Sequence, residues 1–380
     1  MTLRARALRL VAGIGLLGAL VLPGAVGVLA SSSKSEHARL NHVFVIMLEN
    51  HSFSSVIGND NAPFMNELAN RYALATNYYG VTHPSLPNYV ATISGSNWFS
   101  NSDVPSQTFD HRNLIDQLDQ HNIRWGAYME TMPEAGYSGV QYPVNQPLYV
   151  NKHNPFILFD DIRNDPSRAK NIKPYTQLGA DLNSGHAPNF VWITPNQCHD
   201  MHGGVYAAVA PDGSDGTPCP YGNAKDDAND AALKQKADDF VKGAVNTIRS
   251  SKAWTGNSAI FIVTDENDFN AANPDIDSWD SAEGCCDSPI LPDGYQFIGS
   301  NGEYDGNVLD CPGDAKACTY GGGLIPAIIV ARHGPHHYTS DRAYNHYSLL
   351  RTIEENWHLG YLENASDSVQ VHSLNEFLAH

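Results

Sequence analysis

The fold of this chain is decided by residues 43–55, which read VFVIMLENHSFSS. The first six residues form an unbroken apolar run, and a run this short predicts a strand buried on both faces, as in a parallel sheet. The run ends at Glu49 and Asn50, an acid beside an amide. Ligands of open α/β sheets bind beyond the carboxyl ends of the strands, so this strand delivers two oxygen ligands to the expected place of a site. An ordinary polar strand exit is the alternative.

The same pattern recurs later in the chain, where the apolar run 259–264 is followed by Asp265 and Glu266. Helical and strand-like segments alternate between the two runs and after them. This alternation predicts an α/β fold, an α/β/α sandwich with a mostly parallel central sheet. Further strands are expected at 74–79, 124–129, 190–193 and 325–330, and helices from Pro63 (with Asn61 as its cap), at 88–93, 113–121, 231–249 and 346–358.

The first 30 residues read as a secretory signal peptide, because Arg4, Arg6 and Arg9 precede the apolar segment 10–22 and small residues precede Ser31. An uncleaved anchor is the alternative, since residues 11–30 are just long enough to span a bilayer. Residues 31–40 are expected to be a polar linker and residues 41–380 the folded domain. We therefore expect a secreted or extracytoplasmic protein with no stable membrane insertion after cleavage.

The charge of the chain bears on its partners. The sequence carries 23 basic and 41 acidic residues, a formal net charge of −18. Nucleic acid is excluded as an expected partner, because its binding depends on Lys and Arg neutralising phosphates.

Six cysteines lie in the second half of the chain, four of them in a Cys-rich loop insertion at about 267–323. An even number in an exported chain predicts disulfides. A zinc site is the alternative, although two adjacent cysteines lack the usual C-x-x-C spacing. The expected pairs are Cys198 with Cys219, and Cys285 and Cys286 with Cys311 and Cys318 in either order.

The acids and amide at the two strand ends, Glu49, Asn50, Asp265 and Glu266, form a set of oxygen ligands that suits Mg, Ca or Mn. Asp200, His202 and His346 add mixed nitrogen and oxygen ligands, which suit Zn or would hold a phosphate group directly. An EF-hand at 265–270 is the calcium-loop alternative, but the sequence fails that pattern because an oxygen ligand and a glycine are missing. We therefore expect a divalent metal ion of unassigned identity.

Ser85 lies between two prolines, with His83 before it and the expected helix start at Asn88 after it. A helix N-terminus stabilises phosphate, and a serine beside a metal ion becomes a nucleophile for phosphoryl transfer. A turn residue in a Pro-rich loop is the structural alternative. A serine-hydrolase elbow is not indicated, because no G-x-S-x-G motif occurs.

Six motifs follow one another in a fixed order: ENHS at 49–52, THPSLPNY at 82–89, KHNPF at 152–156, PNQCHDMH at 195–202, DE at 265–266 and NHYSLLRTIE at 345–354. This order resembles the phosphoesterase family of the alkaline-phosphatase superfamily. That family includes bacterial secreted acid phosphatases, one of them a mycobacterial enzyme acting on phosphoinositides, and, more distantly, phospholipases C. The Cys-rich segment is longer than in the mycobacterial relative.

The resemblance implies a role for each matching residue. Ser85 is the implied nucleophile, and Glu49, Asn50, Asp265 and Glu266 are the implied metal ligands, the last of which is often Asp in relatives. The implied phosphate-pocket residues are His83, Asn88, His153, His199, Asp200, His202 and His346; relatives differ at the position of His199.

Three functions are consistent with this pattern. The first is a secreted, metal-dependent acid phosphatase that hydrolyses small phosphate monoesters, a phosphoinositide or phospholipid headgroup among them, through a phosphoserine. A phospholipase C-type phosphodiesterase on the same fold is the alternative. A non-enzymatic calcium-binding surface protein is a further alternative.

Overall fold

The computed structural model describes residues 39–204, 218–222, 227–268, 283–311 and 313–378. The expected signal peptide and most of the expected linker lie outside these ranges. Within them, nine strands form the main sheet: β1 (His42–Leu48), β2 (Ala73–Tyr79), β3 (Trp125–Met129), β6 (Ile172–Pro174), β7 (Phe190–Thr194), β8 (Ser258–Thr264), β13 (Leu324–Ala331), β14 (Tyr338–Ser340) and β15 (Tyr344–Asn345).

The strand β1 lies in the interior of this sheet, whose order is β14-β2-β13-β8-β1-β7-β3-β6, with β15 also paired to β2. β1 runs parallel to both of its neighbours, with Val43 opposite Phe190 of β7 and Ala259 of β8. All residues of these three strands are buried. The expected strands, buried on both faces, are confirmed.

One strand of the sheet runs against the others. β13 pairs antiparallel with β8 and with β2, whereas the remaining pairs of the main sheet are parallel. The expected mostly parallel sheet is therefore confirmed.

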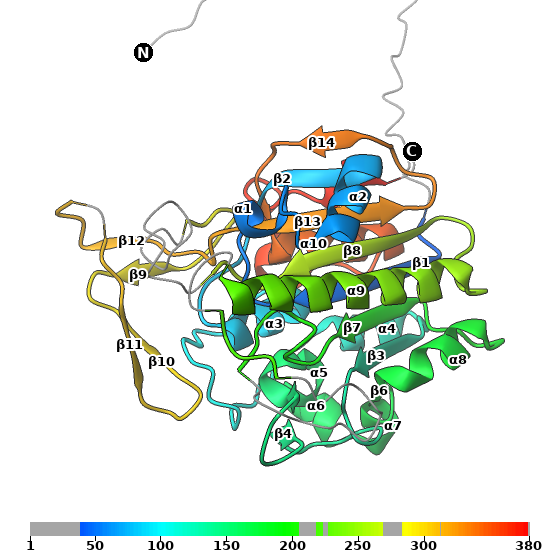
Figure 1. The fold of residues 1–380 in the computed structure, drawn as a ribbon, viewed down its shortest axis with the longest axis horizontal. Helices are drawn as coiled ribbons and strands as arrows, with labels where there is room; N and C mark the ends of the chain where they lie inside the picture. The colour runs from blue at the N-terminus through cyan, green and yellow to red at the C-terminus, as the bar shows by residue number, and fades with distance from the viewer. Residues whose placement is uncertain (1–38, 205–217, 223–226, 269–282, 312, 379–380) are drawn as a thin grey trace, which may run out of the picture. The chain divides into compact units, whose positions relative to one another are not determined.

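Helices cover both faces of the sheet (Figure 1). Alternate residues of β1 point to opposite sides: Val43, Val45 and Met47 enter one core, and Phe44 and Ile46 enter the other. The first core contains α3 (Ser85–Ser94), α4 (Leu114–Gln120), α5 (Pro155–Leu158), α6 (Asp160–Arg163) and α10 (His346–Trp357), and the second contains α2 (Pro63–Arg71), α8 (Leu178–Asn183) and α9 (Ala228–Ser250).

The remaining elements are short. They include helices α1 (Phe53–Val56) and α7 (Pro166–Ala169), strands β4 (Gln141–Tyr142) and β5 (Tyr149–Val150), and four 3-10 turns, η1 (Asn151–His153), η2 (Tyr175–Gln177), η4 (Glu363–Ser366) and η5 (Leu374–Phe377). Among the residues described, no helix combines the length and apolarity needed to cross a bilayer.

The helix that carries Ser85 begins earlier than the sequence predicted. α3 starts at Ser85 with Pro84 as its N-cap, not at Asn88. Proline is tolerated in a first turn, where N–H groups have no intrahelical partner, so Pro87 does not delay the helix. The Asn88 side chain accepts hydrogen bonds from the N–H groups of Val81 and Thr82 at 2.9 and 3.1 Å, which fixes the loop before α3.

The start of α2 also differs in its cap. Pro63 is the first helical residue, as expected, but the N-cap is Ala62 rather than Asn61. The Asn61 side chain accepts a hydrogen bond from Gln235 of α9 instead.

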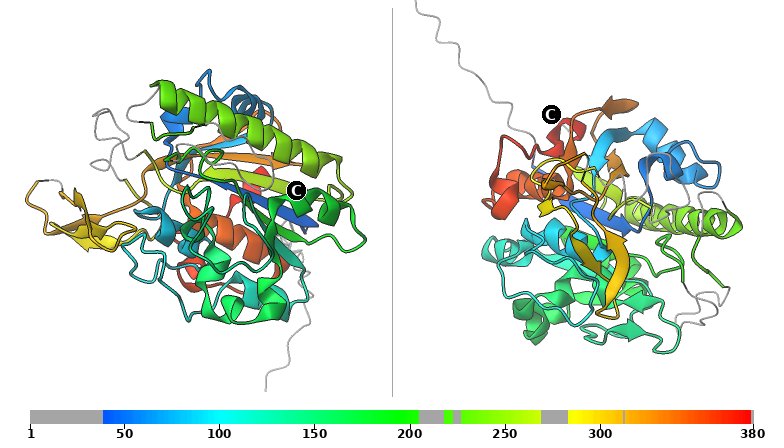
Figure 2. Two further views of the ribbon diagram at one scale, coloured as in Figure 1. Left: turned by 60° about the horizontal axis from the view of Figure 1, so that its bottom comes forward. Right: turned by 90° about the vertical axis from the view of Figure 1, so that its left-hand side faces the viewer.

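Residues 283–323, here called the arm, connect β8 to β13 and extend away from the main sheet (Figure 2). Four short strands form two antiparallel pairs in it, β9 (Ile290–Pro292) with β12 (Ala317–Thr319), and β10 (Gln296–Ile298) with β11 (Tyr304–Val308).

The disulfides confirm one expected pair and correct the other two. Cys198 is bonded to Cys219, but Cys285 is bonded to its neighbour Cys286, and Cys311 to Cys318. The β9–β12 pairing places Cys318 within the arm, next to Cys311. The adjacent cysteines lie at the base of the arm, where the Asn345 side chain donates to both of their carbonyl groups. All six cysteines lie in the described ranges and each one is paired, as expected.

Candidate active site

The candidate site lies where three loops leave the carboxyl ends of β7, β1 and β8. Because these strands are adjacent and parallel, their loops meet at one edge of the sheet. The backbone links them further: Glu49 N–H donates to the Asp200 carbonyl at 2.7 Å, and Asp265 N–H donates to the Leu48 carbonyl at 3.0 Å. The strand order thus brings together acids that lie far apart in the sequence.

Ser85 faces these loops from the first position of α3 and is fully buried. Its Oγ lies 3.0 Å from Glu49 Oε2 and 3.1 Å from Glu266 Oε1. Leu86 N–H, in the same first turn, donates to Asp103 Oδ1 at 2.9 Å. A hydroxyl at a helix N-terminus is therefore held against two carboxylates, one from each of two strand ends.

The Asn50 amide lies between the same two carboxylates. The amide oxygen Oδ1 is 3.0 Å from Glu49 Oε2, 3.1 Å from Glu266 Oε1 and 3.4 Å from Ser85 Oγ. Two arrangements satisfy the Asn50 amide. In one, the amide is rotated and its nitrogen donates to Glu49 and Glu266. In the other, a cation lies among Asn50 Oδ1, Glu49 Oε2, Glu266 Oε1 and Ser85 Oγ. Oxygen atoms about 3 Å apart match neighbouring ligands of a cation bound at roughly 2.0–2.4 Å.

Four fully buried carboxylates meet here, those of Glu49, Asp200, Asp265 and Glu266. Burial, followed by mutual repulsion, raises the pKa of Glu49 and Glu266 well above the ordinary value, and burial raises the pKa of Asp265 to about 7. A bound cation reverses this effect, because it favours the charged form.

The Asp265 carboxylate is only partly hydrogen-bonded, which also favours a bound cation. Its Oδ1 accepts hydrogen bonds from the N–H groups of Asn50 and Glu266, at 3.0 and 2.8 Å. Its buried Oδ2 meets no hydrogen-bond donor in the described part of the chain. The residues present therefore fit a hard divalent cation, which Glu49, Asn50, Asp265 and Glu266 would hold next to Ser85.

A second group of residues adjoins the other oxygen of Glu49. His153 Nε2 lies 3.2 Å from Glu49 Oε1, and His153 Nδ1 lies 3.4 Å from Asp200 Oδ2. Ligand atoms of Glu49, His153 and His202 lie within 4.8 Å of one another, close enough to hold a metal ion. Glu49 thus joins the first group to a second, histidine-containing one.

Lys152 adjoins this second group. Its Nζ lies 2.6 Å from Asp103 Oδ2 and 3.5 Å from His202 Nε2. Although burial lowers it, Asp103 and Glu49 raise the pKa of Lys152 above its ordinary value. The ammonium group is paired with Asp103, so Lys152 adds hydrogen-bond donors and a compensated positive charge beside His202.

The histidines beside Lys152 are held neutral. Burial, and then the charge of Lys152, lower the pKa of His202 to about 3 and the pKa of His153 well below its ordinary value. His202 Nδ1 is 3.0 Å from the Gly203 carbonyl, so this nitrogen carries the proton and Nε2 accepts from Lys152.

His83 contacts the first group rather than the second. Its Nδ1 lies 2.6 Å from Glu266 Oε2, and its ring packs against Tyr320 of the arm with centroids 5.7 Å apart. Burial lowers the pKa of His83 to about 3. His83 thus orients one of the candidate metal ligands, and the arm contributes a wall beside it.

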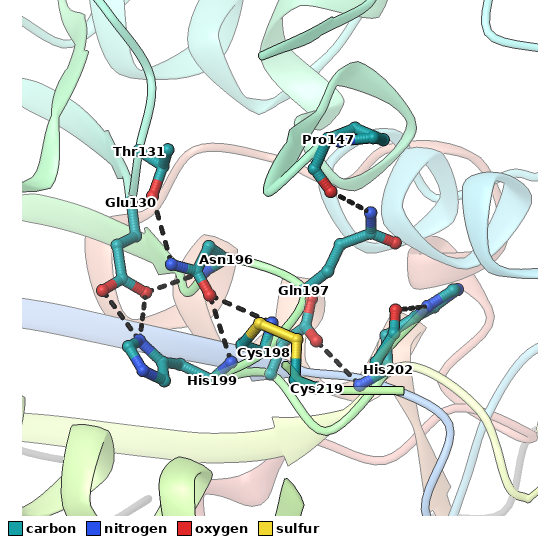
Figure 3. The surroundings of a disulfide bond; sticks show 11 residues. Glu130, Thr131, Pro147, Asn196, Gln197, Cys198, His199, His202 and Cys219 are labelled. Carbon is teal, nitrogen blue, oxygen red and sulfur yellow. Dashed lines mark hydrogen bonds and ion pairs between the residues drawn. A yellow bond between two sulfur atoms is a disulfide. The ribbon is translucent and has the colours of Figure 1, made fainter. Parts of the chain in front are cut away.

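Three residues assigned to the phosphate pocket from the sequence have other partners. Asn88 holds the loop before α3, as described above. His346 Nε2 lies 2.6 Å from the Asp265 carbonyl and its Nδ1 lies 3.2 Å from the Tyr78 hydroxyl. His199 Nδ1 lies 2.9 and 3.0 Å from the two oxygens of Glu130 (Figure 3). Their direct contact with phosphate stays a prediction.

The loop that carries Asp200 and His202 is fixed by several contacts around the Cys198–Cys219 disulfide (Figure 3). The Asn196 side chain accepts from the N–H groups of Cys198 and His199 at 3.0 and 3.2 Å. His202 N–H donates to Asp200 Oδ1 at 2.8 Å.

Two residues in the site were not among those assigned from the sequence. Lys152 had a signal, since it stands next to His153 in the KHNPF motif. Asp103 had none, because nothing in its surroundings resembles a motif; only the fold brings it against Lys152 and α3.

Comparison with known proteins places the chain in a family. The model of the phosphoesterase family matches residues 59–213 and 220–360, more than half of the sequence. This chain belongs to the phosphoesterase family. The family expected from the motif order is thereby confirmed.

Curated relatives share parts of the chain. A phosphate-repressible acid phosphatase of Penicillium chrysogenum is 38% identical over 162 residues, which cover 41% of this chain and 38% of that protein. An acid phosphatase of Aspergillus fumigatus is 37% identical over 175 residues, covering 45% and 38%. A phosphatidylinositol-3-phosphatase of Mycobacterium tuberculosis is 29% identical over 208 residues, covering 53% and 66%. The matches span about two fifths of the length of the two fungal relatives.

Solved structures share the fold. A Bacteroides thetaiotaomicron protein, solved in work on the metabolism of multiple glycosaminoglycans, superposes with a TM-score of 0.51 at 12% identity, covering 90% of this chain and 82% of that one. A protein of the alkaline phosphatase superfamily from Vibrio parahaemolyticus has a TM-score of 0.48 at 13% identity, covering 86% and 67%.

Proposed function

We propose that this chain is a metal-dependent phosphatase that hydrolyses phosphate monoesters through Ser85. The observation that carries the proposal is the position of Ser85 Oγ, 3.0 and 3.1 Å from two buried carboxylates of the candidate metal set and at the first position of α3. Relatives named as acid phosphatases support the reaction class.

The cation, when bound, would lower the pKa of the serine hydroxyl and offset charge on the phosphoryl oxygens. The residues of the chain do the rest. Ser85 Oγ, held at the first position of α3, attacks phosphorus while its proton is lost to solvent. The bond from phosphorus to the alcohol oxygen breaks, and solvent protonates the leaving oxygen. A water molecule then hydrolyses the phosphoserine, releasing phosphate and restoring the hydroxyl.

The second group of residues would bind the phosphoryl oxygens. Lys152 brings a positive charge, and His153 and His202 line the same region. Phosphoryl transfer depends mostly on positioning and on charge stabilisation, which a fixed ammonium group provides. A monoester, with two ionisable oxygens, benefits more from Lys152 than a diester with one.

We also propose that the protein acts outside the cytoplasm on a small phosphorylated compound. The expected signal peptide and the disulfides support export. A phosphoinositide headgroup is a candidate substrate, because one relative is named a phosphatidylinositol-3-phosphatase.

The test compares two chromogenic esters before and after removal of metal. We expect release of p-nitrophenol from p-nitrophenyl phosphate, loss of release after exhaustive chelation, and recovery when a divalent metal is restored. Faster release from p-nitrophenylphosphorylcholine would instead identify a phospholipase C-type diesterase. No release from either ester, with calcium bound, would identify a binding protein.

A further inference from the structure

A buried charged cluster adjoins the Glu49–Asn50 turn. It includes His51, which follows the turn, Asp230 and Lys234 in the first turns of α9, and Asp268, whose Oδ1 lies 3.8 Å from His51 Nδ1. His51 Nε2 lies 2.8 Å from Asp230 Oδ1, and Lys234 Nζ lies 2.6 Å from Asp230 Oδ2. The Lys234 side chain is fully buried.

Much of the contact between α9 and the sheet is apolar. Further along the helix, the buried face is largely apolar, with Ala237, Val241 and Ala244 in the core that also contains Phe44 and Ile46 of β1. Lysine is almost never fully buried unless it is paired, and a buried ion pair is weak evidence for stability, since apolar residues of similar volume often serve as well. These charges therefore call for another explanation.

The contacts of the cluster lead to both ligand-bearing loops. His51 Nδ1 lies 3.1 Å from the Glu49 carbonyl, and the His51 carbonyl accepts from Thr264 Oγ1 at 2.8 Å. Thr264 immediately precedes Asp265. Both ring nitrogens of His51 face oxygen atoms, Nδ1 the Glu49 carbonyl and Nε2 Asp230 Oδ1. His51 thus ties the end of β1 to α9 and to the end of β8.

The turn that His51 supports has an unusual backbone. Asn50 has φ of 37°, which is in the left-handed region. This conformation carries the Asn50 amide to its position between Glu49 and Glu266. A conformation of this kind persists only where its surroundings hold it.

We propose that Asp230 and Lys234 are positioning residues, which act through His51 to hold Glu49 and Asn50 in the arrangement that a bound cation needs. The inference rests on the metal site of the proposed function. Lys234 fixes the Asp230 carboxylate, Asp230 fixes the His51 ring, and the ring fixes the Glu49 carbonyl.

The test measures metal binding directly. The wild type and the Asp230→Asn variant are stripped with chelator and titrated with Mn²⁺ and, separately, Ca²⁺ by isothermal calorimetry. We expect Asp230→Asn to bind about 10–100-fold more weakly, the usual effect of losing a residue that orients a metal ligand.

Asp238→Asn is the matched control. Asp238 is a buried aspartate on the same helix and accepts hydrogen bonds from the N–H groups of Phe64 and Met65 at 2.9 and 2.7 Å, without contacting the site. Its loss weakens the start of α2, so we expect a lower melting temperature with metal affinity within about twofold of the wild type.

A second variant separates positioning from folding. Asp230→Asn removes the carboxylate that lies 2.6 Å from the buried Lys234 ammonium group, whereas the double variant Asp230→Asn with Lys234→Met removes both charges. We expect the double variant to melt near the wild-type temperature but still bind metal weakly. Wild-type affinity in either variant overturns the inference while leaving the proposed function intact. A wild type that binds neither metal overturns both.

Discussion

Ser85 Oγ lies 3.0 Å from Glu49 Oε2, while the other oxygen of that carboxylate lies 3.2 Å from His153 Nε2. Glu49 therefore joins the proposed nucleophile and metal ligands to the proposed phosphate-binding residues. A displacement of the Glu49 side chain changes its contacts with both Ser85 and His153, because the two oxygens belong to one rigid carboxylate.

Replacement of the nucleophile should abolish turnover but not binding. We expect Ser85→Ala to lower kcat by at least about a thousandfold while the affinity for vanadate changes little, since the nucleophile acts in the transition state and not in uniform binding. Labelled phosphate should be trapped on the peptide containing Ser85 in the wild type. Ser94→Ala is the control, because Ser94 is buried in the same helix and donates to the Val90 carbonyl. Label on another residue contradicts the assignment.

Removal of one candidate metal ligand should remove the metal. Asp265→Asn takes away a buried charge whose Oδ2 meets no hydrogen-bond donor among the described residues. We expect metal content, measured by mass spectrometry after dialysis, to fall below about a tenth of the wild-type value, with circular dichroism unchanged. Asp181→Asn, which changes a surface acid paired with Lys173, should retain metal. Full activity of Asp265→Asn would falsify the metal assignment.

Loss of the ammonium group at the second group of residues should weaken phosphate binding. We expect Lys152→Met to raise KM for a monoester, and the inhibition constant for inorganic phosphate, by about tenfold or more, because charge-assisted hydrogen bonds are the strong ones. Lys173→Met is matched to it, since Lys173 also lies 2.6 Å from an aspartate oxygen but belongs to β6 at the sheet edge. Equal effects of the two variants would show that Lys152 has only a structural role.

The buried Glu354 of α10 should make the protein more stable on the acid side. Burial raises the pKa of Glu354 to about 8 from 4.5, although Gln117 donates to it. Between these values the folded state holds a proton that the unfolded state has released, so stability falls as the pH rises through this window. Glu354→Gln is neutral throughout, and we expect it to flatten the dependence of the urea midpoint on pH. An unchanged slope contradicts this account.

The Cys198–Cys219 disulfide should matter for catalysis as well as stability, because it lies beside the loop with Asp200 and His202. Replacing both cysteines with serine should lower the free energy of unfolding by about 2–4 kcal/mol and raise KM. The control replaces Cys311 and Cys318, which close a shorter loop in the arm. If both double variants keep the wild-type KM, the disulfide does not position the loop.

The sequence predicted the ligand-bearing strand ends well for a physical reason. A short apolar run buried on both faces has few alternatives, and the acids after β1 and β8 follow directly from it. The direction of β13 was not predictable, because an apolar run reads the same in either orientation. The prediction of the cysteine pairs within 285–318 was wrong for a related reason. The strand pairing inside the arm, which the sequence does not show, determines which cysteines lie close together.

Contacts between segments that are distant in the sequence also made the structure differ from the predictions. The start of α3 at Ser85 was hidden by Pro87, which usually marks a helix boundary but is accepted in a first turn. Asp103 meets Lys152 across 49 residues of sequence, and no local pattern encodes that contact.

The antiparallel direction of β13 has a consequence for how this scaffold can change. β8 ends and β13 begins at the same edge of the sheet, so the connection between them does not have to cross the sheet. Closing a loop twice as long costs only about 0.6 kcal/mol more, so the arm can lengthen, shorten or be exchanged while every strand of the main sheet keeps its partner. Tyr320 of the arm packs against His83. We therefore expect that replacing the arm alone can change substrate preference.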